Sequence, residues 1–271
     1  MLTKPLDIQL VVFDWAGTTI DYGCLAPAGA FVASFATKDV GVTLAEARGP
    51  MGLHKKDHIR AMLRTDGVGA KWRAAAGRDW TEADVDELYR DVTPRQVEAA
   101  QKYSALIAGV PEVVAELRAK GIKIAATTGY FREAADVVLA AGKRQGYEPD
   151  FAICADDVPA GRPAPWMIFR CMEALNVYPP AAVLKVGDTV IDIEDGRNAG
   201  CWSVGVVDSS NEMGLSLEET KALPHAERAA RHAAVRQRFF DADAHGASTA
   251  ITDIIDMIDG LNAKLANSDR P

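Results

Sequence analysis

The most constraining feature of this sequence is an aspartate that follows its first apolar run. Leu10 to Phe13 are uninterrupted aliphatic and aromatic residues, and Asp14 comes directly after them, ahead of a turn rich in glycine and threonine. A continuous apolar run of this length is typical of a parallel strand that is buried on both faces. Such a strand presents the residues at its carboxyl end to the edge where ligands bind. The sequence therefore predicts a functional carboxylate at Asp14.

The residues after this turn are predicted to be helical rather than to continue a simple βαβ unit. Helix-like spacing of apolar side chains occurs in Pro27 to Val40 and in His54 to Arg64. Thr43 and Glu46 have the spacing of a capping box, which satisfies free N–H groups at a helix start. We find no strand pattern in residues 23–104 and expect them to form an all-helical domain inserted after the first strand.

Strand and helix patterns alternate from Gly109 onward. Strands are predicted at Ile122 to Ala126, Phe151 to Cys154, Val183 to Val186 and Trp202 to Val207. Helices are predicted at Glu133 to Lys143, Trp166 to Leu175 and Ile191 to Asn198, and throughout Leu217 to Leu265. Because parallel strands need crossover connections, this alternation predicts an α/β fold with a doubly wound parallel sheet. Residues 1–22 and 105–271 would form this Rossmann-like core.

Composition argues against several classes of protein. The formal net charge of -8 is unsuited to nucleic-acid binding, which needs clustered lysine and arginine. No apolar run reaches the length of a membrane span, and the N-terminus lacks the apolar region of a signal peptide, so we expect a soluble protein that is not exported. The four cysteines lack C-x-x-C spacing, which argues against a disulfide framework or zinc site and fits the cytoplasm.

Polar residues cluster at the predicted carboxyl ends of four strands. They are Asp14, Thr128, Gly129, Arg162, Asp188 and Asp192. Asp14 and Asp188 would repel each other unless a cation lay between them, and an all-oxygen site suits Mg²⁺. A threonine hydroxyl and a glycine N–H beside an arginine form a suitable cradle for phosphoryl oxygens. Lys185, inside an apolar run, is predicted to lie buried at a sheet edge.

The order of these residues resembles the four motifs of the haloacid dehalogenase superfamily. The resemblance implies that Asp14 is the nucleophile and that the inserted helices are the cap which many members carry between motifs one and two. Members that cleave phosphate esters usually have a second aspartate two residues later, which protonates the leaving alcohol. That position is Ala16 here. A leaving group that needs no proton from this position is therefore expected, which points to a bond other than C–O–P.

Three stretches resemble the phosphonoacetaldehyde hydrolase (phosphonatase) family within that superfamily. They are Pro50 to His58 and Asp156 to Pro163, together with Asp14 to Cys24. The resemblance implies that Lys55, rather than Lys56, forms a Schiff base with the aldehyde, so that the imine accepts the electrons of the C–P bond. The expected activity is hydrolysis of phosphonoacetaldehyde through an aspartyl phosphate, in 2-aminoethylphosphonate degradation. A homodimer is also implied.

The resemblance assigns further roles to individual residues. Mg²⁺ would be held by Asp14, Asp188 and the backbone carbonyl of Ala16, and Thr128, Gly129 and Arg162 would neutralise the phosphoryl oxygens. Cys24, Met51, His58 and Tyr130 would lie near the substrate. His58, three residues after Lys55, would share its helical face and transfer protons. Plainer interpretations stay open, since Met51, Tyr130 and Cys24 fit core packing, His58 fits an interhelical hydrogen bond, and Asp192 fits either site support or a helix cap.

Two other functions are compatible with the sequence. A capped phosphatase or phosphomutase of the same superfamily would act on a phosphate ester, but it predicts an acid at Ala16 and no role for a cap lysine. A binding protein that kept the fold and lost catalysis would not need Asp14, Thr128 and Asp188 together. A small-molecule phosphonate is thus the expected partner, with neither nucleic acid nor membrane.

Overall fold

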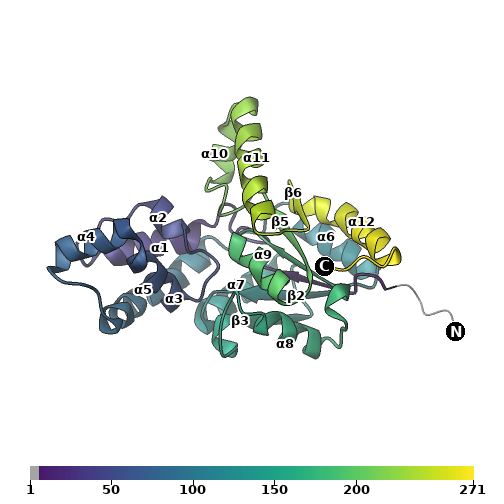
Figure 1. The fold of residues 1–271 in the computed structure, drawn as a ribbon, viewed down its shortest axis with the longest axis horizontal. Coiled ribbons are helices and arrows are strands. Elements are labelled where there is room, and N and C mark those ends of the chain that lie inside the picture. The colour runs from purple at the N-terminus through teal and green to yellow at the C-terminus, as the bar shows by residue number, and fades with distance from the viewer. Residues whose placement is uncertain (1–5) are drawn as a thin grey trace.

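The computed structural model describes residues 6–271 and contains a six-stranded sheet at its centre (Figure 1). In sheet order the strands are β3 (Phe151–Cys154), β2 (Lys123–Thr128), β1 (Leu10–Phe13), β4 (Val183–Gly187), β5 (Trp202–Val206) and β6 (Gly246–Ser248). All neighbouring strands pair in parallel. The predicted doubly wound parallel α/β fold is confirmed, and β1 lies between β2 and β4, so that Asp14 emerges at the middle of the sheet edge.

Helices cover both faces of this sheet. They are α6 (Val110–Ala119), α7 (Arg132–Arg144), α8 (Trp166–Ala174), α9 (Val190–Asn198), α11 (His225–Asp241) and α12 (Ile254–Ala266). The short helix α10 (Leu217–Ala222) lies beside α11 at the top of Figure 1. Val11 and Phe13 pack in one apolar cluster with α6 and α12, whereas Leu10 and Val12 pack in another with α8. Because side chains alternate along a strand, burial of both faces explains the unbroken apolar run before Asp14.

Six helices lie between β1 and β2, and the first five form a separate group. They are α1 (Leu25–Ala36), α2 (Leu44–Arg48), α3 (Lys55–Arg64), α4 (Asp66–Ala76) and α5 (Glu82–Lys102). In Figure 1 they lie together at the left, beside the sheet and its covering helices. Their apolar side chains, including Phe31, Phe35 and Trp72, form a cluster drawn entirely from residues 30–92. These helices therefore have a hydrophobic core of their own.

Local hydrogen bonds determine where the first of these helices begin. The Asp21 carboxylate accepts bonds from the backbone N–H groups of Leu25 and Ala26 at 3.1 and 2.9 Å, so α1 begins before the predicted Pro27. The capping box before α2 is confirmed, since Thr43 Oγ1 accepts from the Glu46 N–H and the Glu46 carboxylate accepts from the Thr43 N–H.

The prediction that Leu217 to Leu265 is entirely helical was wrong, because Gly246–Ser248 forms β6. Three small residues carry no alternating pattern and no β-branched side chain, so nothing local marks them as a strand. Pairing with β5 creates the strand, with Gly205 opposite Ala247. None of the helices between residues 6 and 271 is long and apolar enough to cross a membrane.

Candidate active site

A small cavity lies where the carboxyl ends of β1, β2 and β4 meet the inserted helices. Its volume is about 20 Å³. The core lines it with Asp14, Ala16, Thr128, Gly129, Tyr130, Arg162, Asp188 and Thr189. The inserted segment lines it with Cys24, Pro27, Met51, Gly52 and Lys55. The structure thus brings together most of the residues that the sequence predicts for the site.

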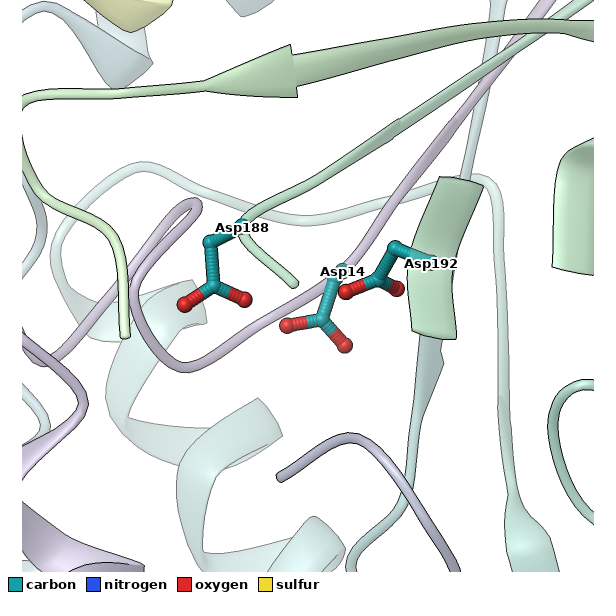
Figure 2. A group of neighbouring side chains, drawn as sticks. All are labelled: Asp14, Asp188 and Asp192. Carbon is teal, nitrogen blue, oxygen red and sulfur yellow. The ribbon is translucent and has the colours of Figure 1, made fainter. Parts of the chain in front are cut away.

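Three carboxylates converge at the floor of this site, as Figure 2 shows for Asp14, Asp188 and Asp192. One oxygen from each lies within 4.8 Å of the other two. Burial, together with the charges of Asp14 and Asp192, raises the pKa of Asp188 well above its usual range. Burial also raises the pKa of Asp14. Such a concentration of buried negative charge suits a divalent cation.

The three carboxylates are not equally free to bind a metal. Asp192 Oδ1 pairs with Lys185 Nζ at 2.7 Å and with Arg162 Nη1 at 2.9 Å, and its Oδ2 accepts the Thr189 hydroxyl at 2.6 Å. Burial alone would raise the pKa of Asp192, but these two cations outweigh it and lower the pKa to about 2. Asp192 is therefore committed to supporting contacts, which leaves Asp14 and Asp188 as the better metal ligands.

Asp188 is held by the loop that follows β5. Its Oδ2 accepts a hydrogen bond from the Asn211 backbone N–H at 2.7 Å. The turn after Asp14 also approaches Asp188 so closely that a β-carbon at Gly17, where φ is +86°, would collide with the Asp188 carboxylate. Only glycine fits this approach without strain. Ala16 also lines the cavity, and two carboxylates with a backbone carbonyl are the kind of all-oxygen set that Mg²⁺ prefers.

Arg162 is anchored among acceptors at the base of the site. Its Nη1 pairs with Asp14 Oδ1 at 2.6 Å as well as with Asp192. Its Nη2 donates to the carbonyl and hydroxyl oxygens of Thr127, both at 2.7 Å. Although burial opposes the charged form, Asp192 and Asp14 outweigh it and raise the pKa of Arg162. The guanidinium is thus a permanent cation in contact with the predicted nucleophile.

Lys55 is the first residue of α3 and is 3% exposed. Its Nζ lies 5.8 Å from the centre of the Phe31 ring and 5.1 Å from that of Tyr130. Burial lowers the pKa of Lys55 to about 8, so an appreciable fraction is the neutral, nucleophilic amine near neutral pH. The neighbouring Lys56 instead pairs with Asp86 at 2.6 Å on the surface. Of the two lysines, only Lys55 reaches the cavity.

The remaining predicted residues differ in their placement. Cys24, Met51 and Tyr130 line the cavity, whereas His58 lies behind Lys55 and does not. The His58 ring stacks on Phe31 at 3.9 Å, and its Nε2 lies 2.8 Å from the Ala47 carbonyl oxygen. Burial and the charge of Lys55 hold the pKa of His58 well below its usual value. Its ring is therefore neutral, and a role in proton transfer stays a prediction.

The inserted segment and the core are in direct contact around the site. Gly52 lies against Gly129 and Thr189, leaving no room for a side chain at Gly129. Arg48 Nη1 donates to the Gly23 carbonyl at 2.7 Å and to Asn211 Oδ1 at 3.2 Å, and Asn211 Nδ2 donates back to the Arg48 carbonyl at 3.2 Å. The residue that holds Asp188 through its backbone therefore also holds the inserted segment through its side chain.

Three residues shape this site in ways that the sequence does not predict. Lys185 was predicted at a sheet edge, but β4 lies between β1 and β5, and Lys185 is an internal partner of Asp192. A lysine within an otherwise apolar strand needs a buried acidic partner. The structure shows that this partner is Asp192. No sequence pattern singles out Asp195 or Asn211. Asn211 acts on Asp188 through its backbone, so no residue type marks it.

Comparison with known proteins places this architecture in a family. Residues 8–200 match the family of haloacid dehalogenase-like hydrolases. The chain is 46% identical to the phosphonoacetaldehyde hydrolases of Bacillus cytotoxicus and Bacillus thuringiensis over 240 residues, 89% of this chain and 91% of each relative. The crystal structure of a phosphonoacetaldehyde hydrolase-like protein from Oleispira antarctica matches with a TM-score of 0.96 and 38% identity, covering 100% of both chains. The chain therefore belongs to the phosphonoacetaldehyde hydrolase family of haloacid dehalogenase-like hydrolases.

Proposed function

We propose that this protein hydrolyses the C–P bond of phosphonoacetaldehyde to acetaldehyde and phosphate. The observation that carries the proposal is a buried lysine, Lys55, lining the same cavity as Asp14, with Ala16 where an ester phosphatase would need an acid. The names of the relatives at 46% identity support the same activity.

The first step follows from the chemistry of the leaving group. A simple carbanion is too poor a leaving group for direct displacement at phosphorus. The neutral Lys55 amine adds to the aldehyde carbon and, with loss of water, forms a protonated imine. When the C–P bond breaks, its electron pair moves into the carbon chain and onto the imine nitrogen, giving an enamine. This electron sink replaces the acid missing at Ala16.

Asp14 supplies the nucleophile for the second half of the reaction. A carboxylate oxygen attacks phosphorus as the C–P bond breaks and leaves an aspartyl phosphate, which water hydrolyses to phosphate. The enamine gains a proton on carbon, and hydrolysis of the resulting imine releases acetaldehyde and restores Lys55. Arg162, Thr128 and Gly129 would neutralise the phosphoryl oxygens, where negative charge concentrates in the transition state.

The residues at the floor fit a resident Mg²⁺. Asp14, Asp188 and the Ala16 carbonyl would hold it, and it would supply positive charge to the phosphoryl group. The raised pKa of Asp188 indicates a charge concentration that a cation would relieve. The ion is also what would allow a carboxylate to approach an anionic phosphonate.

We further propose that residues 23–104 act as a cap that opens for substrate. A cavity of about 20 Å³ holds little more than one water molecule, so the substrate requires the two parts to separate. Closure would exclude water and bring Lys55 to the aldehyde.

A homodimer is the proposed assembly, through aromatic side chains on α8 and the loop that follows it. Trp166, Phe169 and Tyr178 are 47%, 37% and 82% exposed, and an exposed aromatic cluster is typical of a protein interface.

The proposed location is the cytoplasm, which fits four cysteines that are all free thiols. The dimer has a direct test. Sedimentation of Tyr178→Glu beside the unaltered protein tests the dimer: an unchanged sedimentation coefficient would contradict this interface.

Borohydride trapping tests the imine step most directly. Reduction in the presence of phosphonoacetaldehyde should fix a covalent adduct on the peptide that contains Lys55, found by mass mapping. Lys55→Arg should abolish both the adduct and phosphate release, whereas the matched change Lys56→Arg should leave both intact. Full activity in Lys55→Arg would overturn the proposal.

A parallel assay separates the alternative functions. The unaltered protein should hydrolyse simple phosphate esters at a negligible rate, because Ala16 cannot protonate an alkoxide. Fast ester hydrolysis without an adduct on Lys55 would favour the phosphatase or phosphomutase. Binding of phosphonoacetaldehyde with no turnover would favour a non-catalytic protein.

A further inference from the structure

Asp195 is a buried carboxylate that the reaction outlined above does not use. It lies on α9, one turn after Asp192, and is fully buried. Neither of its oxygens accepts a hydrogen bond from any residue in the described part of the chain. The nearest cation is Arg162, whose Nε lies 3.6 Å from Asp195 Oδ2. That Nε–H also lacks an acceptor among residues 6–271.

A buried carboxylate that accepts no hydrogen bond is costly for the fold. Transfer of a charged group from water to the interior is unfavourable unless hydrogen bonds or an opposite charge compensate it. Arg162 and Lys185 compensate the charge only in part, because burial outweighs both cations and raises the pKa of Asp195 to about 7. A neutral side chain of the same shape would be more favourable, so packing alone does not account for an aspartate.

The other contacts of Arg162 indicate a role for Asp195 as an acceptor for the guanidinium. Nη1 pairs with Asp14 Oδ1 at 2.6 Å and with Asp192 Oδ1 at 2.9 Å, so both of its hydrogens are engaged, and it has to leave one carboxylate before it can donate to a phosphoryl oxygen. Asp192 is shared with Lys185, and its two oxygens are already engaged. Asp195 is the acceptor still available, on the Nε side of the guanidinium, away from Asp14.

We infer that Asp195 is a positioning residue, which holds Arg162 through Nε while Nη1 leaves Asp14 for a phosphoryl oxygen. The 3.6 Å separation is about 0.6 Å beyond a normal N–H···O hydrogen bond, so a small rotation of the guanidinium closes it. Arg162 thereby exchanges one carboxylate for another and stays charged and oriented. This inference rests on the proposed function, since it needs an anionic phosphoryl group at Arg162.

Asp195→Asn tests the inference, because it preserves shape and removes the charge. We expect kcat for phosphonoacetaldehyde to fall about tenfold, while the melting temperature is unchanged or higher. Asp195→Glu should recover part of the lost rate. Glu194→Gln, on the same turn of α9, is the matched control and should behave as the unaltered protein. A purely structural role predicts the opposite pattern, a lower melting temperature with proportionate loss of folded enzyme.

A double-mutant cycle with Arg162→Lys isolates the contact. Lysine has no Nε–H at the equivalent point, so Asp195→Asn should cause little further loss in the Arg162→Lys background. Unaltered kcat in Asp195→Asn, or an equal loss in both backgrounds, would overturn the inference. Borohydride trapping on Lys55 should persist in Asp195→Asn. Absence of turnover and trapping in the unaltered protein would instead defeat the proposed function itself.

Discussion

Gly129 at the end of β2 packs directly against the backbone of Gly52, which precedes Lys55 in the inserted segment. A β-carbon at Gly129 would lie 2.9 Å from the Gly52 carbonyl oxygen and 2.8 Å from that of Leu53. Real β-carbons do not approach backbone atoms so closely, and neither carbonyl is the free end of a flexible side chain. The absence of a side chain at Gly129 therefore allows the segment that carries Lys55 to reach the cavity.

Gly129→Ala is expected to keep this segment from closing. We expect kcat/KM for phosphonoacetaldehyde to fall by about tenfold or more, because sub-ångström displacements of a reacting group are costly. Gly29→Ala is the control, since a β-carbon there meets nothing within 4 Å. Steady-state kinetics of both variants check the prediction, which fails if the two variants are equally active.

The contacts between Arg48 and Asn211 predict a second effect on closure. Arg48→Ala removes the donor to Gly23 and Asn211, so the closed form should be less populated and KM should rise severalfold. Water would reach Lys55 more often, and the pKa of its amine should move up from about 8. The pH dependence of borohydride trapping measures this shift. Arg64→Ala, an exposed change at the end of α3, is the control and should leave the pKa of Lys55 unchanged.

The lowered pKa of Lys55 predicts both a rate profile and a stability profile. The neutral amine is the reactive form, so imine trapping should rise with pH and level off above about 8. Because the pKa of Lys55 is lower in the folded than in the unfolded chain, protonation favours unfolding. The resulting destabilisation is complete below pH 8 and disappears as the pH approaches the unfolded value.

Lys55→Met should therefore raise the free energy of unfolding at pH 7, by on the order of 2 kcal/mol. The gain should shrink as the pH rises toward 10.5, the ordinary value for this amine. Urea titrations at pH 7 and pH 10 measure the difference, with Lys56→Met as the exposed control. A gain of the same size at both pH values would show that apolar packing, rather than the buried charge, is responsible.

Removal of Mg²⁺ with a chelator should abolish phosphate release. The affinity for Mg²⁺ should also depend on pH, because protons compete with the ion for the carboxylates. Burial and the nearby carboxylates raise the pKa of Asp188, so protons compete with the ion and its affinity should fall as the pH is lowered. Calorimetric titration with Mg²⁺ at pH 6 and pH 8 checks this. Asp188→Asn should lose most of the affinity and the activity. Full turnover in the presence of chelator would contradict the metal assignment.

The sequence was most informative where function demands a residue type at a strand end. Asp14, Thr128 and Asp188 follow apolar runs, and the structure brings all three to one cavity. The sequence was uninformative where a backbone group makes the contact, or where a strand forms only by pairing with its neighbour in the sheet. Asn211 holds Asp188 through an N–H that every residue except proline carries, and β6 exists only because β5 lies beside it.

The buried charges around the cavity also predict the order in which metal and substrate bind. The carboxylates are Asp14, Asp188, Asp192 and Asp195, and the basic residues are Lys55, Arg162 and Lys185. With the carboxylates ionised and Lys55 as the neutral amine, the residues alone leave an excess of negative charge that repels a phosphonate, whereas a bound divalent ion offsets this excess. Metal should therefore bind first and substrate second, and phosphate should leave before the metal does. Without Mg²⁺, the protein should therefore bind neither the phosphonate nor free phosphate.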